Sequence, residues 1–344
     1  MNSTKCPHET AVVWLSLEFA RERYFAAGLT CRVLPALVSH HYLLQVLPAP
    51  LLESIINMKW YMALFYGIIQ GLADFLPISS SGHLALFQSL FNVGDTEGLF
   101  TFNILLHFGT LMAVLVMYRK DIIPLFPAFF SLCGKTFKGN LFIRENGRDG
   151  KKGSLKLNAE PYERLVILVI LATLPLVLTF FYKDYVEMLS AYPKVVGGIL
   201  IFNGVILFIS DRLAKNGKEL PASTPADALV VGLLQAVAVV PGLSRSGTTI
   251  TAGLLRGFDR QFAVKFSFIL SIPTILAACV LEIPDVVANP IPTADVFPYI
   301  LGMVTAALVG FAAMKLLTFI SKRSNFTVFS FYCWAIGILA VVLC

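Results

Sequence analysis

An apolar segment that is broken by polar residues, and that occurs twice, constrains this chain more than any other feature. Residues 67–83 read Gly-Ile-Ile-Gln-Gly-Leu-Ala-Asp-Phe-Leu-Pro-Ile-Ser-Ser-Ser-Gly-His, with a carboxylate, three hydroxyls and an imidazole in the last ten positions. Residues 232–248 repeat the pattern without a gap, with Arg245 in place of Ser80. If these segments lie in a membrane, their polar groups are costly there and indicate a functional site rather than packing.

The composition supports a membrane location. Hydrophobic residues make up 57% of the 344 residues and charged residues 14%, whereas soluble domains carry about 25% charged residues. An integral membrane protein is therefore the expected class. The six cysteines show no CxxC or CxxH spacing, so neither a zinc site nor a disulfide framework is predicted.

Eight apolar segments follow Met58, and six of them have the length of a membrane-spanning helix. The first and the fifth are broken by Pro, Gly and Ser. Non-helical backbone at membrane depth needs protein or water around it, so both are predicted to be re-entrant helix–loop–helix hairpins. In chain order the segments lie near 62–92, 100–118, 162–182, 194–213, 226–256, 262–282, 296–319 and 326–343.

The predicted fold is an all-α polytopic membrane protein with two inverted repeats, each a re-entrant hairpin plus three transmembrane helices. The repeats cover about 60–213 and 226–344 of one membrane domain, 58–344. Three crossings place the second hairpin on the opposite side from the first, and sites in such proteins lie where broken helices meet near the midplane. Residues 1–57 are predicted to be an N-terminal extension, with disorder, or a translation start at Met58, as the alternatives.

The basic residues predict the orientation. Most Lys and Arg after Met58 fall on one side, in the loop 119–160 and near the ends of the segments that finish at 213, 256 and 319. That side is cytoplasmic by the positive-inside rule, so the first hairpin opens outward. The net charge of +6 is therefore interpreted as a topology signal and a contact to anionic lipid, not as a nucleic-acid site.

The first broken segment holds candidate catalytic groups. Gln70 and Asp74 are four residues apart, on one face of a helix that Pro77 ends or bends. A turn of Ser79, Ser80, Ser81 and Gly82 follows, in which one serine is expected to act only as a helix N-cap. His83 then begins the second half-helix.

The second broken segment supplies an anion site. Free N–H groups and the helix dipole favour negative charge at a helix N-terminus, and Arg245 adds a planar donor suited to phosphate. Two such N-termini that meet would hold a phosphate or diphosphate. The candidate binding residues are Ser79, Ser81, Gly82, Ser244, Ser246, Gly247 and Thr248.

Phosphoryl transfer suits these groups. The Ser80 hydroxyl could attack phosphorus, and His83 could move its proton or act as the nucleophile itself. Asp74, with Gln70, could hold a divalent metal. His107 is interpreted as a packing residue, and Gln235, which matches Gln70 in the second copy, as structural.

These residues resemble the undecaprenyl-diphosphatase family, the bacitracin-resistance type of integral membrane phosphatase. The resemblance covers about residues 60–344 and rests on 71–83 and 241–247, with further matches at 106–110 and 266–273. It implies hydrolysis of the C55 polyprenyl diphosphate to the monophosphate, which recycles the lipid carrier of cell-wall precursors and gives bacitracin resistance.

The resemblance also implies roles and a location. Ser80 falls on the family's proposed nucleophile, His83 on its essential histidine and Arg245 on its phosphate-binding arginine. A Mg²⁺ or Ca²⁺ cofactor is implied, in a bacterial cell-membrane protein whose site opens to the extracytoplasmic side. The residues themselves do not choose between Ser80 and His83 as nucleophile.

Two positions depart from the family's first motif, which usually has glutamate at both. Gln70 removes one negative charge, and Asp74 is shorter by one methylene. The metal site is therefore expected to be weaker, shifted, or completed by water and substrate oxygens.

A polyprenyl-phosphate transporter or flippase is the competing hypothesis, because paired hairpins in inverted repeats are a transporter architecture. His83 beside Ser80 favours an enzyme, since carrying an anion requires no nucleophile. The expected partners are the polyprenyl diphosphate lipid and the bilayer. Nucleic acid is not expected, and a homodimer is left open.

Overall fold

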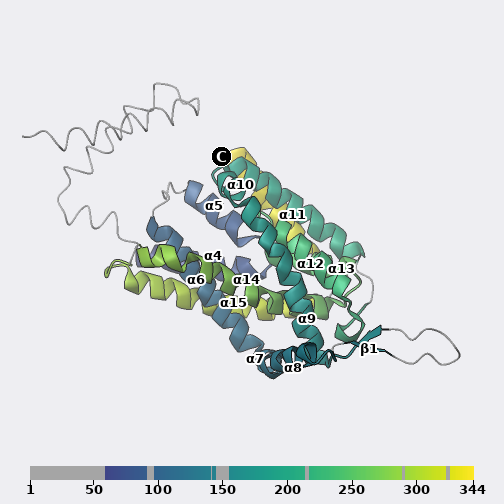
Figure 1. Cartoon of the computed structure of the whole chain (residues 1–344). Helices are drawn as coiled ribbons and strands as arrows, with labels where there is room; N and C mark the ends of the chain where they lie inside the picture. The colour runs from purple at the N-terminus through teal and green to yellow at the C-terminus, as the bar shows by residue number, and fades with distance from the viewer. Residues whose placement is uncertain are drawn as a thin grey trace, which may run out of the picture. The chain divides into compact units, whose positions relative to one another are not determined.

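The computed structural model describes residues 59–90, 97–140, 142–144, 155–213, 217–288, 291–322 and 326–344. The prediction for residues 1–57 lies outside this part of the chain. The described residues belong to one compact unit and are helical apart from loops and two short strands (Figure 1). The predicted all-α class is therefore confirmed at that level.

Both broken segments form helix pairs. The first is α4 (Trp60–Phe75) followed by α5 (Ser80–Leu90), and the second is α12 (Pro225–Val237) followed by α13 (Arg245–Leu255). A capping box fixes the start of α12, since Thr224 and Asp227 exchange side-chain and backbone hydrogen bonds. The second break contains Gly242 at φ +96°, a conformation that favours glycine.

Long helices follow each pair. They are α6 (Glu97–Met117), α9 (Pro161–Thr173) with its 3-10 continuation η2 (Leu174–Phe181), α11 (Pro193–Leu213), α14 (Arg260–Ala288), α15 (Val296–Ser321) and α16 (Thr327–Leu343). Within the described residues, four spans are long and apolar enough to cross a membrane: Pro161–Phe181, Pro193–Arg212, Arg260–Leu281 and Val296–Ser321. A fifth candidate span is the pair Thr101–Met117 and Arg119–Phe137, if the two helices count as one span. They are bent by 74° relative to each other. The sixth predicted span, α16, has 17 residues and is shorter than the four single spans.

The predicted basic loop at 119–160 is more structured than expected. It holds α7 (Arg119–Ile122), α8 (Leu125–Phe137) and an antiparallel pair of strands, β1 (Phe142–Arg144) and β2 (Leu155–Leu157). Ala128 and Leu132 of α8 pack on Val166 of α9. The remaining elements are short: α10 (Lys183–Ser190) and η3 (Leu220–Ala222).

Small residues let α4 approach α15 closely. A Cβ added to Gly71 would lie 2.8 Å from the carbonyl oxygen of Ala306, and one added to Gly67 would lie 2.6 Å from that of Gly302. Such small-residue interfaces are how helices associate in lipid, where apolar surface alone gives little driving force. The close contact fixes α4, and with it Asp74 near its C-terminal end.

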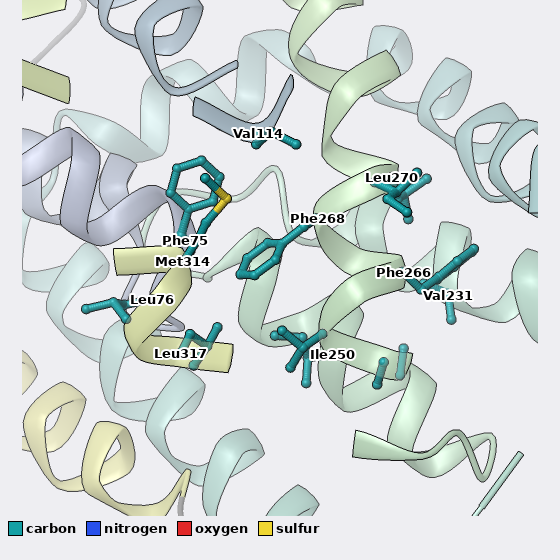
Figure 2. Packing of buried hydrophobic residues seen from close by; sticks show 14 of the residues in the cluster. Phe75, Leu76, Val114, Val231, Ile250, Phe266, Phe268, Leu270, Met314 and Leu317 are labelled. Carbon is teal, nitrogen blue, oxygen red and sulfur yellow. The ribbon is translucent and has the colours of Figure 1, made fainter. Parts of the chain in front are cut away.

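The main core includes residues next to Asp74 in the sequence. Phe75, directly after Asp74, meets Phe268 of α14 edge to face, with ring centroids 5.5 Å apart. Met314 and Leu317 of α15 and Ile250 of α13 belong to the same buried cluster (Figure 2). Elements from both halves of the chain thus share one core, which holds the two broken helix pairs against each other.

Candidate active site

The two helix breaks touch. A Cβ added to Gly82 would lie 3.0 Å from Gly242 Cα, and one added to Gly247 would lie 3.0 Å from Pro77 Cβ. No side chain fits at either glycine without moving the opposite loop. The two chemistry-bearing loops, more than 150 residues apart in the sequence, therefore form one site.

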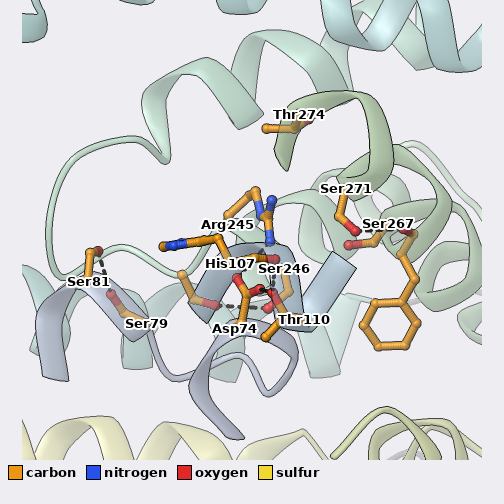
Figure 3. A network of polar contacts seen from close by, with 12 residues as sticks. Asp74, Ser79, Ser81, His107, Thr110, Arg245, Ser246, Ser267, Ser271 and Thr274 are labelled. Carbon is orange, nitrogen blue, oxygen red and sulfur yellow. Dashed lines mark hydrogen bonds and ion pairs between the residues drawn. The ribbon is translucent and has the colours of Figure 1, made fainter. Parts of the chain in front are cut away.

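Asp74 and Arg245 join the two loops electrostatically. Arg245 Nη2 donates to Asp74 Oδ1 at 2.8 Å, and Thr110 Oγ1 donates to Asp74 Oδ2 at 2.7 Å (Figure 3). The Asp74 side chain is 5% exposed and that of Arg245 20%. A buried charge needs a partner, and each of these side chains supplies it to the other across the two halves.

Asn203, in the middle of α11, holds both loops with one amide. Its Nδ2 donates to the Pro77 carbonyl at 3.0 Å, and its Oδ1 accepts from the Ser244 backbone N–H at 3.1 Å. The side chain is fully buried. The Asn203 amide donates through its nitrogen and accepts through its oxygen, so one side chain holds the two breaks in register.

Two serines are helix caps. Ser79 Oγ accepts from Gly82 N–H at 3.2 Å, and Ser244 Oγ accepts from Gly247 N–H at 3.1 Å. The structural role predicted for one serine of the first loop thus falls to Ser79. Its φ of +73° is the only positive value at a non-glycine position in the described residues, and such backbone strain often marks a functional site.

His83 is held from both sides of its ring. Its Nδ1 lies 2.8 Å from the Ser79 carbonyl oxygen and its Nε2 2.9 Å from the Tyr332 hydroxyl of α16. The Tyr332 ring stacks on the imidazole at 5.5 Å, with 10° between the planes. Because a carbonyl only accepts, neutral His83 carries its proton on Nδ1, and Nε2 accepts from Tyr332.

For the phosphate release that the family resemblance implies, we expect Tyr332→Phe to lower the turnover number about tenfold and to leave KM unchanged. The ring stack remains, but Nε2 loses the hydroxyl that orients it. Steady-state phosphate release measures both constants, and Phe331→Leu, on the neighbouring exposed position, is the matched control. A rise in KM with constant turnover would place Tyr332 in substrate binding instead.

The other predicted site residues lie in or directly after the same two helix breaks, but they make different contacts. Ser246 Oγ lies 3.1 Å from Ser244 Oγ and donates to the Leu76 carbonyl at 3.4 Å, while the exposed Ser81 has its hydroxyl 3.4 Å from Ser79 Oγ. Ser80 begins α5 and is partly buried. Thr248 is buried, and its hydroxyl has no partner within the described part of the chain.

Gln70 is fully buried, and neither its amide oxygen nor its nitrogen has a hydrogen-bond partner among the described residues. Its counterpart Gln235 differs, because it donates to the Ala172 carbonyl at 3.3 Å and accepts from Thr274 at 3.4 Å. These contacts agree with the structural interpretation of Gln235. Among the predicted site residues, Gln70 and Thr248 are thus left with side-chain polar atoms that have no partner in the described part of the chain.

His107 bonds to its own helix, with Nδ1 2.9 Å from the Asn103 carbonyl oxygen. This contact fits the packing role predicted from sequence. The site is nevertheless close by, because Thr110 Oγ1 contacts both the His107 carbonyl, at 2.8 Å, and Asp74. His107 is drawn with this network in Figure 3.

Sequence reasoning missed Thr110, Asn203 and Tyr332. Asn203 carried a usable signal, since a lone amide in an apolar span indicates function. Thr110 and Tyr332 carried none, because threonine and tyrosine are ordinary in membrane helices and only the packing of α6 and α16 brings them to the site.

The chain is similar in sequence to known proteins. The sequence profile of the family described as "Bacitracin resistance protein BacA" matches residues 63–339. The chain belongs to this family. Among BacA-family relatives, a Methanobrevibacter smithii protein named "Undecaprenyl-diphosphatase" is 40% identical over 82% of this chain and 96% of its own length.

Two further relatives agree. A Halothermothrix orenii protein named "Undecaprenyl-diphosphatase" and a Bacillus cereus protein named "Undecaprenyl-diphosphatase 3" are each 35% identical, over 83% of this chain and 98% of their own lengths. The family resemblance drawn from the two loops is confirmed.

Proposed function

We propose that this BacA-family protein hydrolyses undecaprenyl diphosphate to undecaprenyl phosphate and inorganic phosphate. The observation that carries the proposal is the contact between the two helix breaks, at Gly82 with Gly242 and at Gly247 with Pro77, which brings the loop of Ser80 and His83 against the loop of Arg245. The names of its relatives support the same reaction. Resistance to bacitracin and a role in cell-wall synthesis follow from recycling of the lipid carrier.

The site residues divide the work between binding and proton transfer. Arg245 and the backbone N–H groups of the two helix starts bind the diphosphate oxygens. Ser80 or His83 attacks the terminal phosphorus, the P–O bond to the bridging oxygen breaks, and water then releases phosphate. If Ser80 attacks, its proton goes to Nε2 of His83, since Nδ1 already carries one. The Tyr332 hydroxyl, which donates to Nε2 in this structure, turns away before this transfer.

An apolar cavity beside His83 suits a lipid substrate. Its volume is about 180 Å³, and Leu86 of α5 with Ile336 and Ala340 of α16 are in its wall. A cavity of about 150 Å³ holds one benzene molecule, so this one has room for roughly one isoprene unit. The prenyl chain would thus begin where the diphosphate ends.

The finer topology also belongs to the proposal. The two halves form inverted repeats with re-entrant hairpins in a bacterial cell membrane, and the site opens to the extracytoplasmic side. The Lys and Arg distribution supports this orientation. Helix pairs at matching places, each followed by long apolar helices, support the repeat.

A divalent cation, Mg²⁺ or Ca²⁺, is proposed as well, although the described residues contain no group of three or more His, Cys, Asp or Glu side chains placed to hold one. Asp74 is paired and Gln70 is neutral. These residues alone do not fit a resident metal ion, and the reaction is therefore derived without one.

Transport of the lipid phosphate is the second candidate, since the same architecture serves transporters. The effect of replacing His83 distinguishes hydrolysis from transport. We expect His83→Ala to lower phosphate release from undecaprenyl diphosphate at least about a hundredfold, the usual range for a general base. Purified protein in liposomes, assayed for released phosphate and for lipid movement, measures both activities.

A wild-type protein that moved lipid but released no phosphate would overturn the enzymatic function. His107→Ala is the matched control, because its ring nitrogen bonds only its own helix in the described structure. An equal loss in both histidine variants would mean that folding, not proton transfer, was disturbed.

A further inference from the structure

Helix α8 lies across one end of the helix bundle. The helices Thr101–Met117 and Arg119–Phe137 are bent by 74° relative to each other, and α7 and α8 run across the ends of α6 and α9 (Figure 1). Transmembrane helices tilt from the membrane normal by about 20° on average. A helix bent this far from α6 therefore runs close to the membrane plane and does not continue the crossing.

One face of α8 packs on the first turns of α9. Leu132 and Val166 belong to one buried cluster, and Lys135 Nζ lies 2.7 Å from Glu163 Oε2. The apolar span of α9 begins at Pro161, and Val166 lies about 7.5 Å further along the helix at about 1.5 Å per residue. These contacts hold α8 at the depth where amphipathic helices lie in a membrane interface, about 5–10 Å.

The opposite face of α8 is aromatic and exposed. Phe126 is 65% exposed, Phe130 71% and Phe137 93%. The first two are each two positions from the buried Ala128, and two positions turn a helix by about 200°, so they point away from α9. Phe137 follows Phe126 by about three helical turns and shares their side. These three residues form the phenylalanine face, an exposed apolar surface of the kind that contacts a membrane or another protein.

Basic residues stand at both ends of α8. Arg119 and Lys120 come before it and Lys138 directly after it, and all three are exposed. The helix itself contains no Asp or Glu, and the nearby Asp121 pairs with Lys265 at 2.7 Å. Long basic side chains extend to the headgroup level and attract anionic lipid. A bilayer surface therefore accepts the phenylalanine face and the three cations together.

We propose that α8 is an interfacial helix, which inserts the phenylalanine face at the boundary between headgroups and acyl chains and binds anionic phospholipid through Arg119, Lys120 and Lys138. In the topology proposed above, this lipid belongs to the cytoplasmic leaflet. The proposal does not depend on the hydrolytic reaction, and its failure would leave that function unaffected.

Fluorescence quenching of the full-length protein in nanodiscs tests the insertion. Phe130→Trp places a reporter on the phenylalanine face, the emission of the three native tryptophans is subtracted with the wild-type protein, and phospholipid brominated on its acyl chains is the quencher. We expect the added tryptophan to lose at least about half of its emission, as for a side chain at the acyl boundary. Asn140→Trp, at an exposed polar position after α8, is the matched control and is expected to lose little.

The headgroup preference needs a second measurement. Energy transfer from Phe130→Trp to a trace of dansyl-labelled phosphatidylglycerol is compared with transfer to dansyl-labelled phosphatidylcholine, in phosphatidylcholine nanodiscs. We expect transfer to the anionic lipid to be at least about twofold greater. Replacing Arg119, Lys120 and Lys138 by glutamine is expected to remove the difference. Lys59→Gln with Lys194→Gln, which removes exposed cations at the starts of α4 and α11, is the control and is expected to keep it.

The results that would overturn the proposal are distinct. Equal quenching of Phe130→Trp and Asn140→Trp would show that α8 does not insert. An unquenched Phe130→Trp whose emission changes with protein concentration would assign the phenylalanine face to a second copy of the chain. Equal transfer to the two labelled lipids would refute the binding of anionic lipid. If Phe130→Trp fails to fold, Phe126→Trp provides the same reporter on the same face.

Discussion

Replacing Arg245 with alanine is expected to abolish at least about 99% of phosphate release. The site loses the guanidinium group that pairs with Asp74 and is proposed to bind the diphosphate. The same change leaves Asp74 buried and without its charged partner. Breaking a buried ion pair from one side costs about 3–5 kcal/mol, so the variant is also expected to be less stable. A loss of activity alone would not separate binding from folding.

The double variant Asp74→Asn, Arg245→Ala separates them. It removes both charges, and the new amide oxygen at position 74 can still accept from Thr110, so we expect most of the stability to return while activity stays low. Arg245→Lys keeps the charge but loses the planar fork, and we expect an intermediate rate. Recovery of hydrolysis in the double variant would show that Arg245 stabilises the fold and does not bind substrate.

Asn203→Asp is expected to have the second-largest effect, a loss of activity of about a hundredfold together with a lower melting temperature. The new carboxylate can still accept from Ser244 N–H, but it cannot donate to the Pro77 carbonyl that lies 3.0 Å away. A buried hydrogen-bonding group left unpaired costs about 1–3 kcal/mol, and a buried charge costs more.

Asn158→Asp is the matched control for Asn203→Asp. Asn158 also donates its amide to a carbonyl, that of Asn140 at 3.2 Å, but the contact is exposed to solvent. We expect a change in stability of less than about 0.5 kcal/mol, as for most surface substitutions. Melting temperature and phosphate release, measured on both variants, test this prediction. Unaltered activity in Asn203→Asp would contradict the role of Asn203 in holding the two helix breaks in register.

The helix pairs could be predicted from the sequence because the residues within each break are sufficient to end one helix and start the next. Pro77 and Gly242 lie in the breaks, and Ser79 and Ser244 cap the helices that follow. The convergence of Asp74 and Arg245 was also predictable, but only through the repeat, since nothing local relates residues 171 positions apart.

Other parts depended on tertiary packing. The ion pair of Asp74 with Arg245 was not predicted. Asp74 was expected to be a catalytic residue and a metal ligand, because neither loop alone shows which partner the carboxylate meets. Tyr332 reaches His83 only because α16 packs on α11 and α5. Helix α8 has one basic residue, Lys135, and was missed because the other basic residues of 119–160 led the whole segment to be interpreted as a loop. Its buried residues pack against α9.

The most direct test of the whole account is phosphate release from undecaprenyl diphosphate by purified full-length protein in lipid nanodiscs. Wild-type protein is expected to release one phosphate per lipid, and the folded double variant Asp74→Asn, Arg245→Ala to release almost none. Absence of phosphate release by the wild-type protein with Mg²⁺, with Ca²⁺ and without either cation would contradict the account.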